Sequence, residues 1–183
     1  MQGKPYPERP HGNAMLDTLD LSLSLPKDTY KRQIEQLMRQ LRALQNACWE
    51  KHLPVIVVLE GWAAAGKGAL VKNMINYMDP RGFMVHPTVA ASPEELQYPF
   101  LWRFWKNLPP KGEVAFFYHS WYTHVLEDRL LKKVGDRQIP TIMREINAFE
   151  RQLVDDGAAI AKFWIHLSKK ELKKHFTLQM IGK

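Results

Sequence analysis

The sequence contains only one cysteine, Cys48, among its 183 residues. A disulfide within the chain is therefore excluded, and such sparse cysteine is typical of a reducing compartment. Apolar runs of the length that crosses a membrane are also missing, and residues 1–25 hold no apolar core of the kind that a signal peptide needs. We therefore expect a cytoplasmic protein without a membrane partner.

Acidic side chains are in the minority, because 26 Lys and Arg stand against 19 Asp and Glu and leave a net charge of +7 at pH 7. This excess suits a polyanionic ligand, although it also serves solubility alone. The composition, 45% hydrophobic and 25% charged, is typical of a globular protein, and the length suffices for one domain. We expect an extended arm over residues 1–25, rich in Pro and Gly, and one domain over residues 26–183.

One stretch carries a motif, LPVIVVLEGWAAAGKG over residues 53–68. Residues 55–59 are apolar and mostly β-branched, which predicts a buried strand, and apolar residues at helical spacing follow from residue 69. Between them lies the G-x-x-x-x-G-K pattern of a phosphate-binding loop, whose N–H groups, helix N-terminus and lysine attract an anion. The predicted phosphate-binding residues are Gly61, Ala64, Ala65, Gly66, Lys67 and Gly68.

This loop lacks the Ser or Thr that ordinarily holds magnesium after the lysine, because Gly68 takes that position. The end of the predicted third strand lacks an acid as well. Tyr118 and His119 stand where a phosphotransferase of this kind normally places a metal-holding acid. We therefore expect few protein ligands for a magnesium ion (Mg2+) at this site.

A long helix is predicted to run to about Trp49 from a cap at Asp28 or Thr29. Its apolar residues follow alternating steps of four and three and form one stripe: Tyr30, Ile34, Leu37, Leu41, Leu44 and Cys48. We expect this stripe to pack against the domain itself. The alternative is that it pairs with a helix of a partner chain.

Strands and helices alternate along the rest of the chain. The predicted strands cover residues 55–59, 83–89, 114–118 and 158–167, and the predicted helices cover residues 69–78, 121–134, 140–156 and the segment after Ser168. Capping boxes at Ser92 and Ser168 each predict a helix start. Residues 98–105 are rich in aromatic side chains and include Arg103. They could stack on a nucleotide base together with Arg103, but we favour the interpretation that they form the buried face of a helix. The alternation predicts a three-layer α/β fold of the P-loop NTPase type, with a parallel sheet and helices on both faces.

Several blocks of the sequence resemble the polyphosphate kinase 2 family, and together they span about residues 28–180: residues 61–68, 79–83, 98–105, 108–113, 120–122 and 162–169. The resemblance implies a domain that moves phosphoryl groups between polyphosphate and nucleotides, with Mg2+ as cofactor. Active members of the family read G-x-D-A-A-G-K-G in the loop. They read F-D-R-S-W-Y at the end of the third strand, with a further arginine shortly after.

This chain departs from the family at the positions that carry the chemistry. The loop aspartate is Ala63, the strand-end aspartate and arginine are Tyr118 and His119, and the later arginine is His124, so none of these catalytic positions is intact. The family's lid lies beyond the last helix, and the chain stops at Lys183 before reaching it. Some members carry two such domains in tandem, the first of them degenerate, and the resemblance is to that first domain.

Three functional hypotheses follow. The first is a catalytically degenerate domain with a structural, oligomerising or polyphosphate-binding role, partnered by a second copy or a catalytic domain. The second is an active polyphosphate-dependent nucleotide kinase with substitute metal ligands. Glu60 and Asp128 are the candidates, although we favour Glu60 as the end of the first strand and Asp128 as a surface residue of a helix near Arg129. The third is a stand-alone polyanion-binding module, and nucleic acid is expected in none of them. His119 and His124 could donate hydrogen bonds to phosphate or bind a metal as a pair. We favour the interpretation that they are partly exposed polar residues that replace arginine.

Overall fold

The computed structural model describes Leu16 and residues 19–181, without the side chains of residues 178–181. Most of the predicted arm, residues 1–15 and 17–18, lies outside the described residues. Residues 19–26 form neither helix nor strand, and Leu23 is 81% exposed. The division into an arm and a domain stays a prediction. No helix in the described part of the chain is long and apolar enough to cross a membrane.

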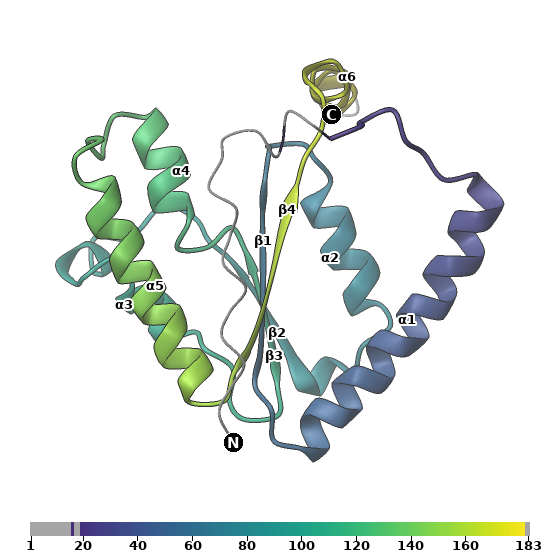
Figure 1. Ribbon diagram of the computed structural model, residues 1–183, viewed down its shortest axis with the longest axis horizontal. Helices are drawn as coiled ribbons and strands as arrows, with labels where there is room; N and C mark the ends of the chain where they lie inside the picture. Colours follow the sequence, from purple (N-terminus) through teal and green to yellow (C-terminus); the bar gives the residue numbers. More distant parts are fainter. Residues whose placement is uncertain (1–15, 17–18, 182–183) are drawn as a thin grey trace.

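Four parallel strands form one sheet in the order β2-β3-β1-β4 (Figure 1). Each strand begins and ends within two residues of its predicted limits: β1 Val55–Gly61, β2 Phe83–Pro87, β3 Val114–Tyr118 and β4 Ala159–Ile165. The central strand β1 pairs through Leu59 with Tyr118 on one side and with Phe163 on the other. The carboxyl ends of β1 and β3 therefore lie next to each other, where ligands bind in sheets of this kind.

Helices cover both faces of the sheet, which confirms the predicted fold class (Figure 1). Helices α1 (Lys27–Glu50) and α2 (Lys67–Ile75) cover one face. Helices α3 (Trp102–Trp105), α4 (Thr123–Leu130) and α5 (Ile139–Asp155) lie over the other. Helix α6 (Lys169–Ile181) follows β4 at the carboxyl end of the sheet, and short 3-10 turns occupy Pro80–Gly82 and Glu95–Gln97.

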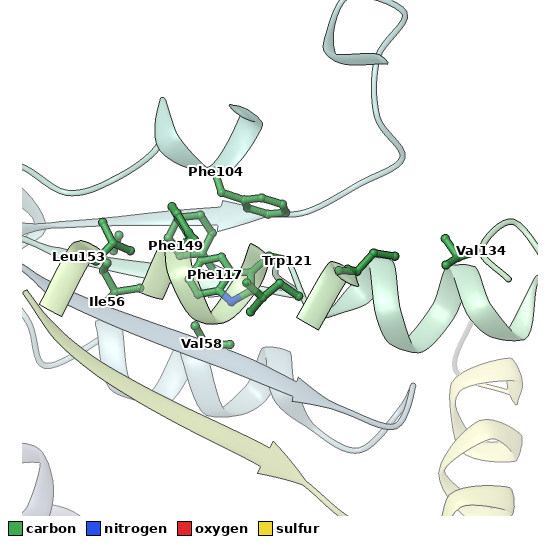
Figure 2. Close-up of a cluster of buried hydrophobic side chains, with 11 residues drawn as sticks. Ile56, Val58, Phe104, Phe117, Trp121, Val134, Phe149 and Leu153 are labelled. Carbon is green, nitrogen blue, oxygen red and sulfur yellow. The ribbon is translucent and has the colours of Figure 1, made fainter. Parts of the chain in front are cut away.

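Strand β1 sends alternate side chains into two separate cores, as expected for a strand covered on both faces. Ile56 and Val58 pack with Phe117 and the fully buried Trp121 beneath α5 (Figure 2). Val57 and Leu59 point the other way, into a cluster that includes Val71 of α2. The strand and the loop that follows it are therefore fixed from both sides.

Two predicted helix starts differ from the structure. Helix α1 begins directly after Pro26, whose fixed backbone starts the helix, so Asp28 and Thr29 lie inside its first turn and do not cap it. The capping box at Ser92 does form, because Glu95 N donates to Ser92 Oγ at 3.2 Å and Ser92 N donates to Glu95 Oε2 at 3.1 Å. It opens only a 3-10 turn, since Tyr98 must be extended before Pro99.

The apolar stripe of α1 is only half covered, so the expectation that it packs on its own domain is wrong for part of it. Tyr30, Leu37 and Leu44 are 47%, 54% and 61% exposed. The helix is instead anchored by a buried polar residue, Gln45. Its Oε1 accepts a hydrogen bond from Asp79 N at 2.7 Å, and its Nε2 donates to Asp79 O at 2.9 Å.

Candidate phosphate-binding site

The predicted phosphate-binding residues form the turn between β1 and α2. Gly61, Ala64 and Gly66 have φ angles of 129°, 61° and 96°, so the backbone curls through the left-handed region three times within six residues. A side chain at Gly61 would meet the main chain of Ile165, whose nitrogen lies 2.7 Å from the position of a Cβ. Glycine is therefore required there by close packing against β4 as well as by its φ.

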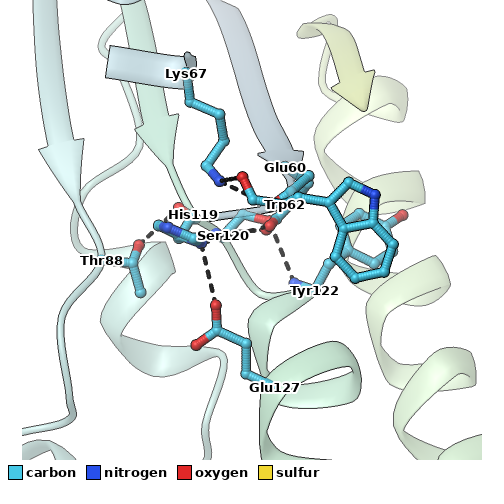
Figure 3. Close-up of polar contacts among 9 residues, drawn as sticks. Glu60, Trp62, Lys67, Thr88, His119, Ser120, Tyr122 and Glu127 are labelled. Carbon is cyan, nitrogen blue, oxygen red and sulfur yellow. Dashed lines mark hydrogen bonds and ion pairs between the residues drawn. The ribbon is translucent and has the colours of Figure 1, made fainter. Parts of the chain in front are cut away.

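Lys67, the first residue of α2, folds its side chain back over the loop (Figure 3). Its Nζ donates to Gly61 O at 2.8 Å and to Trp62 O at 3.0 Å, and it lies 5.7 Å from the centre of the Tyr118 ring. An ammonium group has three N–H donors, so these two bonds leave one for an anion. Burial lowers the pKa of Lys67, while the nearby charges of Glu60 and Glu127 act to raise that pKa.

Glu60 is a buried carboxylate close to Lys67 (Figure 3). The residue is only 6% exposed and lies in β1, as predicted for a residue near the strand end. Its Oε1 accepts from Ser120 N at 2.8 Å and from Ser120 Oγ at 2.7 Å. The Ser120 hydroxyl in turn accepts from Tyr122 N at 3.2 Å. Glu60 thus ties the end of β1 to the segment that leads from β3 into α4.

His119 lies at the centre of the site between two carboxylates (Figure 3). Its Nδ1 is 3.7 Å from Glu60 Oε2 and 3.6 Å from Glu127 Oε1, too far for a hydrogen bond to either. Its backbone has a φ of 62° and is held at both ends, because His119 N donates to Leu59 O and Thr88 Oγ1 donates to His119 O. The backbone of His119 is therefore fixed, and its imidazole lies among acidic oxygens near the loop lysine.

His124 has different neighbours. Its ring stacks on Phe100 with 4.6 Å between the ring centres, and its Nδ1 lies 2.7 Å from Asp128 Oδ2. Asp128 also faces Lys133 at 3.5 Å, whereas the side chain of the next residue, Arg129, pairs with Asp136 at 2.8 Å. Asp128 thus pairs with His124 and Lys133, whereas Glu127 is the acid of α4 that faces His119.

Contacts from β4 and α6, which no local sequence pattern indicates, also reach the loop. Trp62 Nε1 donates to His166 Nδ1 at 3.1 Å, and the Trp62 ring meets Trp164 edge-on at 6.0 Å. His175 of α6 lies with Nδ1 3.0 Å from the carbonyl oxygen of Ala64, one of the loop residues with positive φ. The carboxyl-terminal elements therefore help to hold the loop in its curled form.

The aromatic run over residues 98–105 is helix core only in part, because α3 covers Trp102–Trp105 alone and Tyr98 and Trp105 are 46% and 44% exposed. Phe104 is buried in the core, and Tyr98 stacks on Trp102 with 4.2 Å between the ring centres. Arg103 pairs with Glu95 at 3.3 Å, so its guanidinium is not free to cover a base.

Comparison with known proteins agrees with this geometry. A family model described as Polyphosphate kinase 2 matches residues 24–180. The chain belongs to the polyphosphate kinase 2 family. It is 37% identical over 161 residues to a polyphosphate:AMP phosphotransferase of Pseudomonas aeruginosa, covering 87% of this chain and 32% of that protein. A polyphosphate:AMP phosphotransferase of Pseudomonas syringae pv. tomato is 34% identical over 169 residues, covering 91% and 34%.

The solved structure of a polyphosphate kinase 2 from Arthrobacter aurescens is also similar. It superposes with a TM-score of 0.86 at 27% identity and covers 90% of this chain and 62% of that one. The chain thus spans only about a third of the length of the two polyphosphate:AMP phosphotransferases.

The side chains at the loop do not fit a magnesium ion in the way that the polyphosphate kinase 2 motif implies. Ala63 offers no carboxylate. The Tyr118 ring faces Gly68, and a Cβ at Gly68 would lie 3.8 Å from that ring. Magnesium prefers oxygen ligands at octahedral geometry. The nearby Glu60 already uses Oε1 to bind Ser120. Within the described residues, no three His, Cys, Asp or Glu side chains gather in a geometry that would hold a metal.

Proposed function

We propose that this chain is a polyphosphate kinase 2 domain that binds polyphosphate at its loop without transferring phosphoryl groups. One observation carries the proposal. The curled loop and Lys67 are in place, whereas Ala63 and Tyr118 occupy the positions of the family's two metal-binding aspartates. Binding needs backbone N–H groups and positive charge, which the loop provides. Transfer also requires metal ions that neutralise the charge developing on the phosphates.

Such a domain would serve a longer or assembled phosphotransferase. Its relatives are named polyphosphate:AMP phosphotransferases, and the chain covers about a third of their length. We infer that a separate catalytic domain supplies the metal site, while this domain contributes a binding surface for the polyphosphate chain and a structural support.

A second candidate function rests on Glu60 and Glu127. Both carboxylates act on Lys67 and flank His119, so they provide negative charge beside the loop. In an active polyphosphate-dependent nucleotide kinase they would replace the missing aspartates as metal ligands. Turnover separates this candidate from a binding domain.

We expect the purified chain to show no phosphoryl transfer between polyphosphate and AMP, ADP, GMP or GDP. The physical reason is that Ala63 and Tyr118 offer no carboxylate for a metal, and Glu60 already uses Oε1 to bind Ser120. The measurement is nucleotide turnover over a range of magnesium concentrations, with Lys67→Ala as the background. Turnover of the parent above that background at any magnesium concentration would establish the second candidate and end the first.

Polyphosphate binding is expected to weaken about tenfold or more in Lys67→Ala, because a hydrogen bond to a charged group contributes about 1.5–3 kcal/mol. Binding should also weaken with added salt. Each lost phosphate contact should reduce the slope of log binding constant against log salt concentration by roughly one. Calorimetry at several salt concentrations measures both. The matched control is Lys72→Ala, which removes an exposed lysine from the same helix. Equal losses in the two variants would show that general charge, and not the loop, binds the polyanion.

Restoring both acids should restore a magnesium site. In Ala63→Asp with Tyr118→Asp, two carboxylates facing one site repel each other without a cation, so we expect a lower melting temperature than the parent. Added magnesium should raise the melting temperature of the double variant, and each single variant should respond less. Thermal melts with and without magnesium and polyphosphate test this. If magnesium does not raise the melting temperature of the double variant, the two positions do not face one site.

A further inference from the structure

A cavity of about 410 Å³ lies between the end of α1 and the turn that precedes β2. Its lining includes Asn46, Trp49 and Glu50 from the helix and Arg81 and Gly82 from the turn. Small-molecule sites usually have volumes of about 300–1,000 Å³, so this cavity is large enough for a compact ligand. It adjoins the amino ends of β1 and β2, whereas the phosphate-binding loop follows the carboxyl end of β1 (Figure 1). The length of β1 separates the two places by roughly 20 Å, at about 3.3 Å per residue.

Two sets of hydrogen bonds hold the walls of this cavity in place. Gln45 binds the main chain of Asp79 through both atoms of its amide, and this pair joins α1 to the turn. Asp79 in turn accepts two hydrogen bonds from the guanidinium of Arg81, with Nε at 3.1 Å from Oδ1 and a terminal nitrogen at 3.0 Å from Oδ2. A site whose walls are held in this way binds with a smaller loss of conformational freedom.

Two of the lining side chains are planar and open to solvent. Trp49 is 55% exposed, and the side chain of Arg81 is 85% exposed. Indole rings and guanidinium groups both stack on flat aromatic ligands. The two parallel bonds to Asp79 restrict the orientation of the guanidinium plane, so Arg81 offers a defined stacking face.

Asn46 and Glu50 supply polar groups that can select a ligand. They lie four residues apart near the end of α1, so they face the same side of the helix, and both are exposed. The amide of Asn46 offers a donor and an acceptor side by side, which match an amino group and the adjacent ring nitrogen of adenine. The carboxylate of Glu50 can accept hydrogen bonds from the hydroxyl groups of a ribose.

We propose that this cavity binds adenosine, with the base stacked between Trp49 and Arg81 and its edge bound by Asn46. Glu50 then holds the ribose. The site lies at the opposite end of the sheet from the phosphate-binding loop, so this inference goes beyond the polyphosphate binding proposed above and does not depend on it.

The first test is calorimetric titration of the full chain with adenosine, which has no phosphate for the loop to bind. Trp49→Ala and Arg81→Lys should each weaken binding at least about fivefold, because each removes one stacking face, and Arg81→Lys keeps the positive charge beside Asp79. The matched control is Tyr30→Ala, which removes a 47% exposed aromatic residue from the other end of α1 and should bind adenosine as the parent does.

Three outcomes of this titration would overturn the proposal. The first is a parent that binds no adenosine at millimolar concentration. The second is binding that Arg81→Lys leaves unchanged, since adenosine would then lie elsewhere. The third is displacement of adenosine by excess polyphosphate, which would place it at the loop.

The second test changes the base that the cavity selects, and it keeps the proposal falsifiable if Trp49→Ala disturbs folding. The parent should bind adenosine more tightly than guanosine. Asn46→Asp replaces the donor of the amide with a second acceptor, which suits the two neighbouring N–H groups of guanine. The ratio of adenosine affinity to guanosine affinity should therefore fall at least about tenfold in this variant. An unchanged ratio would show that Asn46 does not contact the base and would overturn the proposal.

Discussion

Gly61→Ala is expected to unfold the protein or to lower its free energy of unfolding by about 4 kcal/mol or more, one of the largest effects of any single change in the loop. The new methyl group would meet the backbone of Ile165, with the nitrogen at 2.7 Å and the carbonyl carbon at 2.9 Å. Backbone atoms within a sheet cannot move aside as a flexible side chain does. The β1–β4 pair would therefore separate at its carboxyl end. Urea unfolding measures the loss.

Gly66→Ala is the matched control for this prediction. Gly66 also has a positive φ, 96°, but a Cβ there would have no atom within 4 Å. Only the backbone strain remains, which costs roughly 1–2 kcal/mol. Similar losses in the two variants would show that the φ angles, and not the contact with Ile165, make glycine necessary at position 61.

Glu60→Ala is expected to lower the free energy of unfolding by about 3 kcal/mol. The change removes the acceptor of two hydrogen bonds from Ser120, which is fully buried, and an unsatisfied buried donor costs about 1–3 kcal/mol. The turn between β3 and α4 should loosen, and His119 with it, because the imidazole faces the same carboxylate. Urea unfolding gives the stability, and hydrogen exchange at the Ser120 amide reports the local loss.

Glu60→Gln separates the hydrogen bonds from the charge. The amide oxygen of glutamine can still accept from Ser120, so we expect a loss of about 1 kcal/mol or less. Polyphosphate binding should not fall in this variant, since a negative charge beneath Lys67 has been removed. A glutamine variant as unstable as the alanine variant would mean that the charge of Glu60 holds the site together.

The sheet and the loop were predictable because local signals define them. The β-branched run at residues 55–59 favours a buried strand, which is β1. The glycines and lysine that follow it identify the position of the loop before α2. The alternation of strands and helices then requires parallel pairing. These inferences use residues that are close together in the chain, and the structure confirms the fold class that they predict.

The surroundings of the loop could not be predicted in the same way. Successive residues of a helix point about 100° apart, so a change of one residue in the start of α4 rotates all its side chains. That rotation decides whether Glu127 or Asp128 faces His119. Trp62 meets His166, and Ala64 meets His175, across 104 and 111 residues of sequence. Apolar spacing does not identify Gln45, because its buried side chain is a polar amide that binds the main chain of Asp79.

The packing of Gly61 against Ile165 has a consequence for the order of folding. The loop residues leave the ribosome early, but their partners at Ile165, His166 and His175 are translated about a hundred residues later. Contacts of such sequence separation form slowly, because the chain must close a long loop before they contribute. A nascent chain that ends before β4 should therefore have β1 and α2 without a finished anion site. The proposed polyphosphate site should therefore form only after β4 and α6 have been translated.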